Sequence, residues 1–528
     1  MNKIDKIKSI VKQVWGNPRP AISLILLNLL LGILMLIPLV YVFLRSLQAG
    51  PKLWFKLISS YLSELIINTI TLTLVVSVLA ISIGVLMSWL VVGTNLPGRK
   101  IWQWILALPL VIPPYVGALS YIILFRPRGW IYQLIGHSIL PIYSFWGAVI
   151  VLTIFTYPYV YIITSSSLKK INQSYIEVGR SFGMKPFTIF LKIILPLIKP
   201  AIGAGGFLIA LYVLSDFGAV AMLRYKTFSS AIYYQLTGKF DRSGAAILST
   251  VLIFFTMIFL YLENRSRKGQ KFFQNQGTYR KFKPFDLGKW KIIALFLVGS
   301  VAFLGVGIPL SILTYWSISG IKAGILNSRF FSYIFNTFLV AGSAALISTV
   351  AAIPVSFLKS RYPSPLSSSV TRFAYTGYIL PGVIVALGII FIFNQYLPYF
   401  YGTPLMLLIA YIIRFLPLSL RSIESSLALI SPRIDEAAKS MGVSPLKMIF
   451  QVILPLIFPG LMAGGALVFV SSIKELPATL ILRPAGFDTL AVRVWLEASE
   501  GFYELAAPAA LIIILISVIP LKYLLKQK

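Results

Sequence analysis

Residues 177–206 read EVGRSFGMKPFTIFLKIILPLIKPAIGAGG, and residues 436–465 read EAAKSMGVSPLKMIFQVILPLIFPGLMAGG. The two segments align at an offset of 259 without a gap, and 13 of the 30 aligned positions are identical. A weaker similarity lies upstream, where the pairs Asn68-Thr69 and Asn336-Thr337 each open an apolar stretch. A repeat of this length with widely separated copies indicates that the chain consists of two related halves.

The composition places both halves in a membrane. Of the 528 residues, 58% are hydrophobic and 12% are charged, and the mean hydropathy is +0.87. Soluble domains carry about 25% charged residues. Several stretches exceed the roughly 20 apolar residues that cross a bilayer as a helix. These values exclude a soluble enzyme, a disordered chain and a fibrous repeat, and they predict an all-α polytopic membrane protein.

Twelve apolar stretches are long enough to be membrane spans. They lie near residues 22–44, 66–93, 101–124, 145–167, 201–222, 245–263, 292–318, 332–358, 371–393, 403–420, 460–479 and 505–524. An even number of spans separates the two repeats, so both repeats face the same side of the membrane. This arrangement predicts two parallel six-helix halves related by a pseudo-two-fold axis along the membrane normal.

The basic residues indicate the orientation of the chain. The net charge of +32 would suggest a nucleic-acid partner in a soluble protein. Here, more than twice as many lysines and arginines fall on the side of the N-terminus as on the other side. This asymmetry predicts that both termini are cytoplasmic and that no nucleic acid is bound. The densest basic cluster, 264–291, is predicted to be a cytoplasmic linker between a first half, 1–263, and a second half, 292–528.

Each repeat predicts a short helix, a glycine turn and a second helix. Asn172 and Ser431 are suited to cap the N-termini of the short helices. Gly183 and Gly442 are suited to end them in the left-handed conformation. The second helices then begin at the Lys185-Pro186 and Ser444-Pro445 steps.

Apolar and small side chains recur along the short helices at the spacing of one helical face. They are Tyr175, Val178, Gly179 and Phe182 in the first copy and Ile434, Ala437, Ala438 and Met441 in the second. One interpretation is an amphipathic helix lying on lipid headgroups. The repetition favours another, in which each helix docks into a groove of a partner subunit.

The repeated segments resemble the EAA loops of ABC-importer permeases. The loops cover 172–200 and 431–459, and the residues that match are Glu177, Gly183, Glu436, Ala437, Ala438 and Gly442. The first copy has Val178 and Gly179 where the family usually has two alanines. Two loops in one chain resemble a fused permease, and all eight of these residues are then expected to couple the chain to its ATPase.

Within that family the chain most resembles permeases for ferric iron. The stretches that carry this resemblance are 215–219, 223–225, 474–479, 487–491 and 506–510. The resemblance implies two copies of an ATPase subunit on the cytoplasmic face, an external (periplasmic) substrate-binding protein, and a location in the inner membrane. Thiamine, sulfate and polyamines stay open as other substrates of such permeases.

The chain contains no phosphate-binding G-x-x-x-x-G-K-[ST] sequence, so it is not expected to hydrolyse ATP itself. No cysteine and a single histidine, His137, argue against a bound metal cofactor or redox centre. A secondary transporter with two six-helix halves is one alternative, but it does not account for the two repeated loops. A membrane-embedded enzyme is another, and it would need clustered acids or histidines.

Two acidic residues are candidates for a substrate path. Asp216 aligns with Glu475 at the repeat offset of 259, and both fall late in the span after the EAA loop. Acids within a membrane are costly and often functional, and oxygen ligands suit a hard metal cation. The alternative is that each carboxylate ends its helix and pairs with a nearby base, Lys474 or Arg224.

The loops on the outer side carry further charges. The bases are Arg126, Arg128, Arg224, Lys226, Lys239 and Arg242, and the acids are Asp241, Asp488, Glu497, Glu500 and Glu504. They are predicted either to steer a binding protein or to be ordinary solvated charges. Pro113 and Pro381 are predicted to break the third and ninth spans, at breaks that either line a cavity or merely kink the packing.

Overall fold

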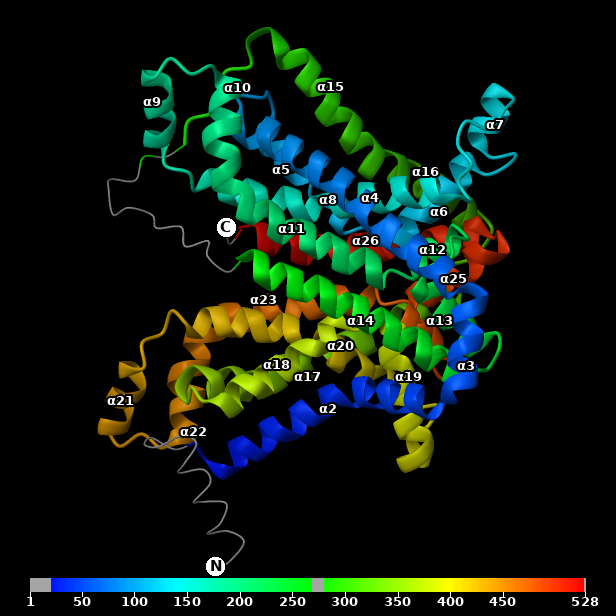
Figure 1. The fold of residues 1–528 in the computed structure, drawn as a ribbon, viewed down its shortest axis with the longest axis vertical. Helices are drawn as coiled ribbons and strands as arrows, with labels where there is room; N and C mark the ends of the chain where they lie inside the picture. Colours follow the sequence, from blue (N-terminus) through cyan, green and yellow to red (C-terminus); the bar gives the residue numbers. More distant parts are fainter. Residues whose placement is uncertain (1–19, 268–279, 281, 527–528) are drawn as a thin grey trace, which may run out of the picture.

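A computed structural model describes residues 20–267, 280 and 282–526 of the chain. Within these residues the chain is helical, and its only β-type pairing is one isolated bridge between Thr94 and Phe285. The helices run roughly parallel to one another as an elongated bundle (Figure 1). The predicted all-α class is confirmed.

The two halves contain matching series of helices. The first half consists of α2 (Ile22–Gln48), α3 (Gly50–Leu57), α4 (Ser63–Ser88), α5 (Arg99–Ile105), α6 (Pro114–Phe125), α7 (Trp130–Ile135), α8 (Phe145–Lys169), α9 (Gln173–Ser181), α10 (Pro186–Ile189), α11 (Leu195–Ser215), α12 (Gly218–Met222), α13 (Phe228–Thr237) and α14 (Arg242–Arg267). The second half consists of α15 (Lys291–Ala302), α16 (Ile308–Lys322), α17 (Ser328–Arg361), α18 (Pro365–Ile379), α19 (Gly382–Tyr396), α20 (Pro404–Leu427), α21 (Arg433–Ser440), α22 (Pro445–Met448), α23 (Leu454–Ile473), α24 (Pro477–Leu482), α25 (Leu490–Glu500) and α26 (Tyr503–Lys526).

The number of spans agrees with the sequence. Ten helical stretches in the described residues are long and apolar enough to cross a membrane, and two bent helix pairs raise the number to 12. The pairs are Arg99–Leu110 with Pro114–Ile135, bent by 93°, and Pro365–Ile379 with Gly382–Tyr396, bent by 111°. Pro113 and Pro381 lie at these bends, as predicted, because proline cannot donate the backbone hydrogen bond that continues a helix.

The second helix of each repeat continues into a span. A π-helical turn joins α10 to α11 at Phe190–Ile194, and another joins α22 to α23 at Ile449–Ile453. The two turns occupy equivalent positions at the repeat offset. In the first half, one unbroken stretch therefore runs from Pro186 to Ser215, beginning well before the span predicted at 201–222.

The short helices α9 and α21, called here the elbow helices, lie at one end of the molecule (left in Figure 1). Gly183 and Gly442 follow them with φ of +70° and +77°, the left-handed conformation that was predicted. The Asn172 side chain accepts the Ser174 N–H at 3.2 Å, and the Ser431 hydroxyl accepts the Arg433 N–H at 3.3 Å. The predicted helix caps are thus confirmed in both copies.

The first span of each half packs against the other half: this span is α2 in the first half and the stretch Gly288–Lys322, which contains α15 and α16, in the second. Helix α2 contacts α18 and α19, and α16 contacts α6. The rings of Tyr41 and Phe391 stack at 4.3 Å between α2 and α19. The Tyr121 hydroxyl donates to the Leu304 carbonyl at 3.0 Å across the second contact. These reciprocal contacts join the two halves into one packed unit.

Close helix packing within the second half depends on glycine, which gives a first prediction. A Cβ added at Gly377 in α18 would overlap the carbonyl oxygen of Ile413 in α20, whereas Gly342 in α17 has open space. Gly377→Ala is expected to destabilise the fold by about 1–3 kcal/mol through overpacking. Gly342→Ala is the control and should be neutral or stabilising. Thermal unfolding of the purified chain in detergent measures both, and equal transition temperatures would contradict the prediction.

Candidate functional site

The elbow helices each expose three apolar or small side chains at the same positions. In the first copy these are Tyr175 and Val178 on α9 and Phe182 directly after it. In the second copy they are Ile434 and Ala437 on α21 and Met441 directly after it. Phe182 is 76% exposed and Met441 is 83% exposed. Exposed large apolar side chains in a repeated pattern mark a contact surface for a protein partner or for a membrane.

The remaining small residues of the predicted stripe point inward. Gly179 is buried, and a Cβ there would lie 2.8 Å from the Ile193 side chain and 3.2 Å from that of Ile189. Ala438 is likewise 7% exposed. Gly179 and Ala438 therefore allow each elbow helix to pack closely on the helix that follows, and the exposed face is narrower than the sequence pattern indicated.

The glutamates of the two EAA loops are exposed on the elbow helices. Arg180 lies three residues after Glu177 on the same helix, but Glu177 forms its ion pair with Arg280, at 3.2 Å. The Arg180 guanidinium lies 5.1 Å from the centre of the Phe285 ring. Both partners come from the segment between the halves.

A cavity of about 310 Å³ lies between the two halves and contains both predicted path residues. Asp216 follows α11 and Glu475 follows α23. Both residues are buried, with 8% of Asp216 and 5% of Glu475 exposed. The first proline break reaches the same cavity, because Pro113 and Pro114 line it, whereas Pro381 at the second break lines a different pocket. The fold therefore brings together predicted residues from three separate segments.

Asp216 lies between α11 and α12 and caps the N-terminus of α12. Its carboxylate accepts the N–H groups of Ala219 at 3.1 Å and Val220 at 3.2 Å, at the start of α12. The Ser229 hydroxyl donates to its backbone carbonyl. Asp216 forms no ion pair within the described part of the chain, and the Arg224 guanidinium lies 5.0 Å from the centre of the Tyr143 ring. The suggested pairing with Arg224 is wrong.

Glu475 does the same in the second half and also has a cationic partner. Its carboxylate accepts the Ala478 N–H at 3.1 Å, at the start of α24, and it forms an ion pair with Arg414 of α20. Lys474, the partner suggested by the sequence, donates instead to the Leu110 carbonyl at 3.0 Å. That carbonyl belongs to the broken third span, so Lys474 connects the two halves.

The cavity is chemically different on its two sides. At the repeat offset, Arg414 corresponds to Phe155 and Lys474 corresponds to Ser215, and all four residues line the cavity. The second half therefore supplies both bases, while Asp216 of the first half has no matching base. The repeat alone does not predict this asymmetry, because it depends on how α8 and α20 pack around the cavity.

Tyrosine hydroxyl groups line the cavity, but its described residues do not form a cluster of metal ligands. Tyr115, Tyr159, Tyr212 and Tyr378 line it, and the buried Tyr115 hydroxyl has no hydrogen-bond partner. Among the residues that were described, no three His, Asp or Glu side chains converge on one point. Such a lining suits a transient contact better than a resident ion.

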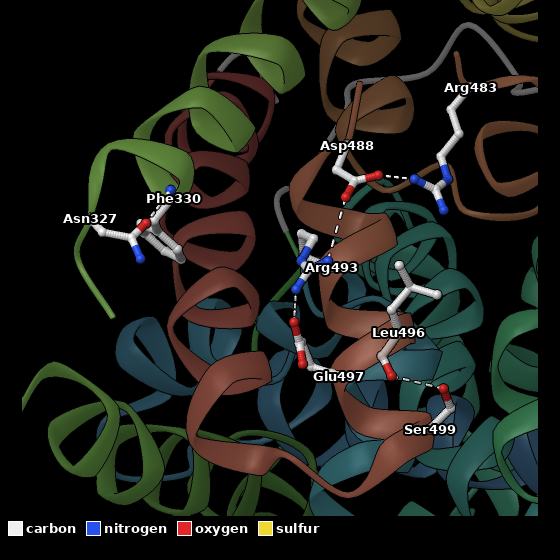
Figure 2. A network of polar contacts seen from close by, with 8 residues as sticks. All are labelled: Asn327, Phe330, Arg483, Asp488, Arg493, Leu496, Glu497 and Ser499. Carbon is white, nitrogen blue, oxygen red and sulfur yellow. Dashed lines mark hydrogen bonds and ion pairs between the residues drawn. The ribbon is translucent and has the colours of Figure 1, made fainter. Parts of the chain in front are cut away.

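The acids at the end opposite the elbow helices are largely paired (Figure 2). Asp488 forms ion pairs with Arg483 and Arg493, and Arg493 also pairs with Glu497. Glu497 is only 6% exposed. Asp241 accepts the Gly244 N–H at 2.9 Å and holds the start of α14. These three acids take part in local contacts, so Asp488 and Glu497 are not freely solvated charges. The steering role stays a prediction.

The helical halves, the central cavity and the paired elbow helices define a membrane transport subunit. The chain belongs to the family described as "Binding-protein-dependent transport system inner membrane component", which matches residues 80–268 and 344–524. The two matches correspond to the two halves. The chain is thus an ABC transporter permease and an inner-membrane component with both permease units in one polypeptide.

Two of the relatives named here are ferric transport permeases and a third is a sulfate permease. The chain is 33% identical over 516 residues to the "Fe(3+)-transport system permease protein FbpB 2" of Haemophilus influenzae, covering 96% of this chain and 99% of the relative. It is 24% identical to the "Ferric transport system permease protein FbpB" of Actinobacillus pleuropneumoniae, over 78% of this chain and 63% of the relative. The "Sulfate transport system permease protein CysW" of Escherichia coli is 23% identical over 45% of this chain and 87% of the relative.

The Arg414–Glu475 pair gives a second prediction. Arg414→Gln leaves the Glu475 carboxylate without its cation in a buried site, and the expected cost is about 3–5 kcal/mol of stability. The double variant Arg414→Gln with Glu475→Gln removes both charges and should recover most of that loss. Thermal unfolding in detergent measures both variants. A single variant as stable as the double variant would show that the pair carries no such cost.

Proposed function

We propose that this chain is the membrane-spanning subunit of an ATP-driven importer of ferric iron and works by alternating access. Support for the substrate comes from the ferric permeases among its relatives, one of which it matches over nearly its whole length. Support for the mechanism comes from the cavity between two helical halves. In this scheme the first half is 1–263, the linker is 264–291 and the second half is 292–528.

The partners follow from the elbow helices. Two copies of an ATPase subunit dock on α9 and α21 at the cytoplasmic face, and closure of the ATPases moves the halves. The observation that carries this proposal is the pair of matching exposed apolar faces at one end of the molecule. An external binding protein delivers iron at the other end, both termini are cytoplasmic, and lipid surrounds the spans.

Asp216 and Glu475 form the substrate path in this proposal. Their carboxylates line a cavity to which both halves contribute, and a hard cation prefers oxygen ligands. The bases Arg414 and Lys474 in the same cavity favour an anion such as sulfate as the second candidate. Uptake assays with radioactive ferric iron and radioactive sulfate distinguish the two substrates.

Docking of the ATPase gives the third prediction. Phe182→Asp with Met441→Asp places a charge in each apolar face, and loss of such contacts weakens binding strongly. ATPase recovered with the purified chain and iron uptake should both fall by about tenfold or more. Phe240→Asp, an equally exposed phenylalanine at the opposite end, is the control. Unchanged ATPase recovery with the double variant would contradict docking at these helices.

The substrate path gives the fourth prediction. Asp216→Asn with Glu475→Gln removes both carboxylate charges and retains similar side-chain shapes, so iron uptake should fall while membrane insertion is unchanged. Glu64→Gln, at an exposed acid outside the cavity, serves as control. Full uptake by the double variant would remove both residues from the mechanism.

A further inference from the structure

The two elbow helices are attached to the membrane helices by different devices. In the second half, Arg361 at the end of α17 forms an ion pair with Asp435 of α21, with Nε and Oδ2 2.7 Å apart. Arg361 also donates to the Ile430 carbonyl at 3.1 Å. Both charged side chains are nearly buried, at 6% and 10% exposure, so this direct attachment is shielded from solvent.

The first half lacks this ion pair at the equivalent positions. The Asn-Thr similarity relates α4 to α17 at an offset of 268, and this offset places Gly93 opposite Arg361. The repeat offset of 259 places Ile176 opposite Asp435. A glycine and an isoleucine cannot form a charged link.

Matching contacts support the α4–α17 alignment. The Asn68 side chain donates to the Lys226 carbonyl at 3.2 Å, and that of Asn336 donates to the Asp488 carbonyl at 3.1 Å. The hydroxyls of the two following threonines accept backbone N–H groups at the starts of α13 and α25, at 3.1 and 2.9 Å. The two helices therefore occupy equivalent places in their halves.

In the first half, a segment before α15 connects the elbow helix to the end of the α4 segment, in place of the missing ion pair. This segment, residues 282–287 with Arg280, is called the linker strap. The Phe285 N–H donates to the Gly93 carbonyl at 2.8 Å, and the Asn95 N–H donates to the Phe285 carbonyl at 2.9 Å. The Asn95 side chain also donates to Asp286 at 2.6 Å, and this bond lowers the pKa of that exposed carboxyl. The strap is thus fixed to the end of the α4 segment.

The same strap holds the elbow helix α9. The Gln173 N–H donates to the Arg280 carbonyl at 3.0 Å, and the Gln173 side chain accepts the Lys283 N–H at 2.9 Å. Arg280 pairs with Glu177. Phe285 is 4% exposed and belongs to one apolar cluster with Ile176, the residue that replaces Asp435.

We propose that the linker strap is a brace that replaces the Arg361–Asp435 ion pair in the first half and transmits movement of α9 to α4. Phe285 is its central positioning residue, because it bonds to Gly93 and packs with Ile176. The linker then has a mechanical role beyond joining the halves. This inference rests on the proposed docking of ATPases to the elbow helices.

The test measures iron transported per ATP hydrolysed by the full assembly, with its ATPase and iron-loaded binding protein, in proteoliposomes. This ratio is independent of the amount of folded protein. Phe285→Ala and Arg361→Ala should each lower it about threefold or more, because one elbow helix loses its attachment in each variant. Lys289→Ala, an exposed linker residue outside the strap contacts, should leave the ratio unchanged.

The outcomes separate failure of the brace from failure of the proposed function. If Arg361→Ala lowers the ratio and Phe285→Ala does not, the brace is refuted and ATPase docking stands. If neither variant changes the ratio, docking at the elbow helices fails and the brace falls with it. If uptake and hydrolysis by Phe285→Ala fall in parallel, the strap only stabilises the fold and the proposal is overturned.

A disulfide provides an independent test, since the chain has no cysteine of its own. Gln173→Cys with Lys283→Cys joins α9 to the strap where they are already in contact. A brace moves together with its helix, so the oxidised variant should transport iron at the rate of the same variant reduced with dithiothreitol. Transport blocked by oxidation and restored by reduction would mean that the strap must release during the cycle, which overturns the proposal.

Discussion

Every backbone polar group that faces the bilayer interior must find a partner within the protein, and this constraint explains the centre of the molecule. Helices α11 and α23 both stop inside the bundle and are followed by the short helices α12 and α24. The freed N–H groups at the starts of these helices are met by Asp216 and Glu475. A carboxylate at a helix N-terminus is favourable, so two charges that are costly in a membrane become acceptable where the helices break.

The asymmetry of the cavity follows from the same constraint. Two buried carboxylates facing one space would repel each other unless other groups met their charge. The second half provides Arg414 against Glu475, while Asp216 depends on backbone N–H groups alone. The two halves therefore place acids at equivalent positions in different surroundings. The difference lies in positions such as Phe155 and Arg414, which occupy equivalent helices.

Local patterns in the sequence predicted the helices, their caps and the two proline breaks, because each depends on residues close together in the chain. Gly183 needed only its place after a helix to be assigned the left-handed conformation. Partners were predicted poorly where they came from distant segments. Helical spacing places Arg180 next to Glu177 on one helix face, but the ion pair of Glu177 is with Arg280. Helical spacing could not anticipate that a segment one hundred residues away returns to α9.

The continuous helix of each repeat explains how an event at one end of the molecule can affect the cavity. The stretch from Pro186 to Ser215 has 30 residues, which is about 45 Å at 1.5 Å per residue. One end packs against the elbow helix through Gly179, and the other ends at Asp216. A helix transmits displacement along its axis only when its ends are held, and the π-helical turn at Phe190–Ile194 is where it can bend. In the proposed brace, holding α9 against α4 is what decides whether movement at the elbow bends this turn or shifts the carboxylate.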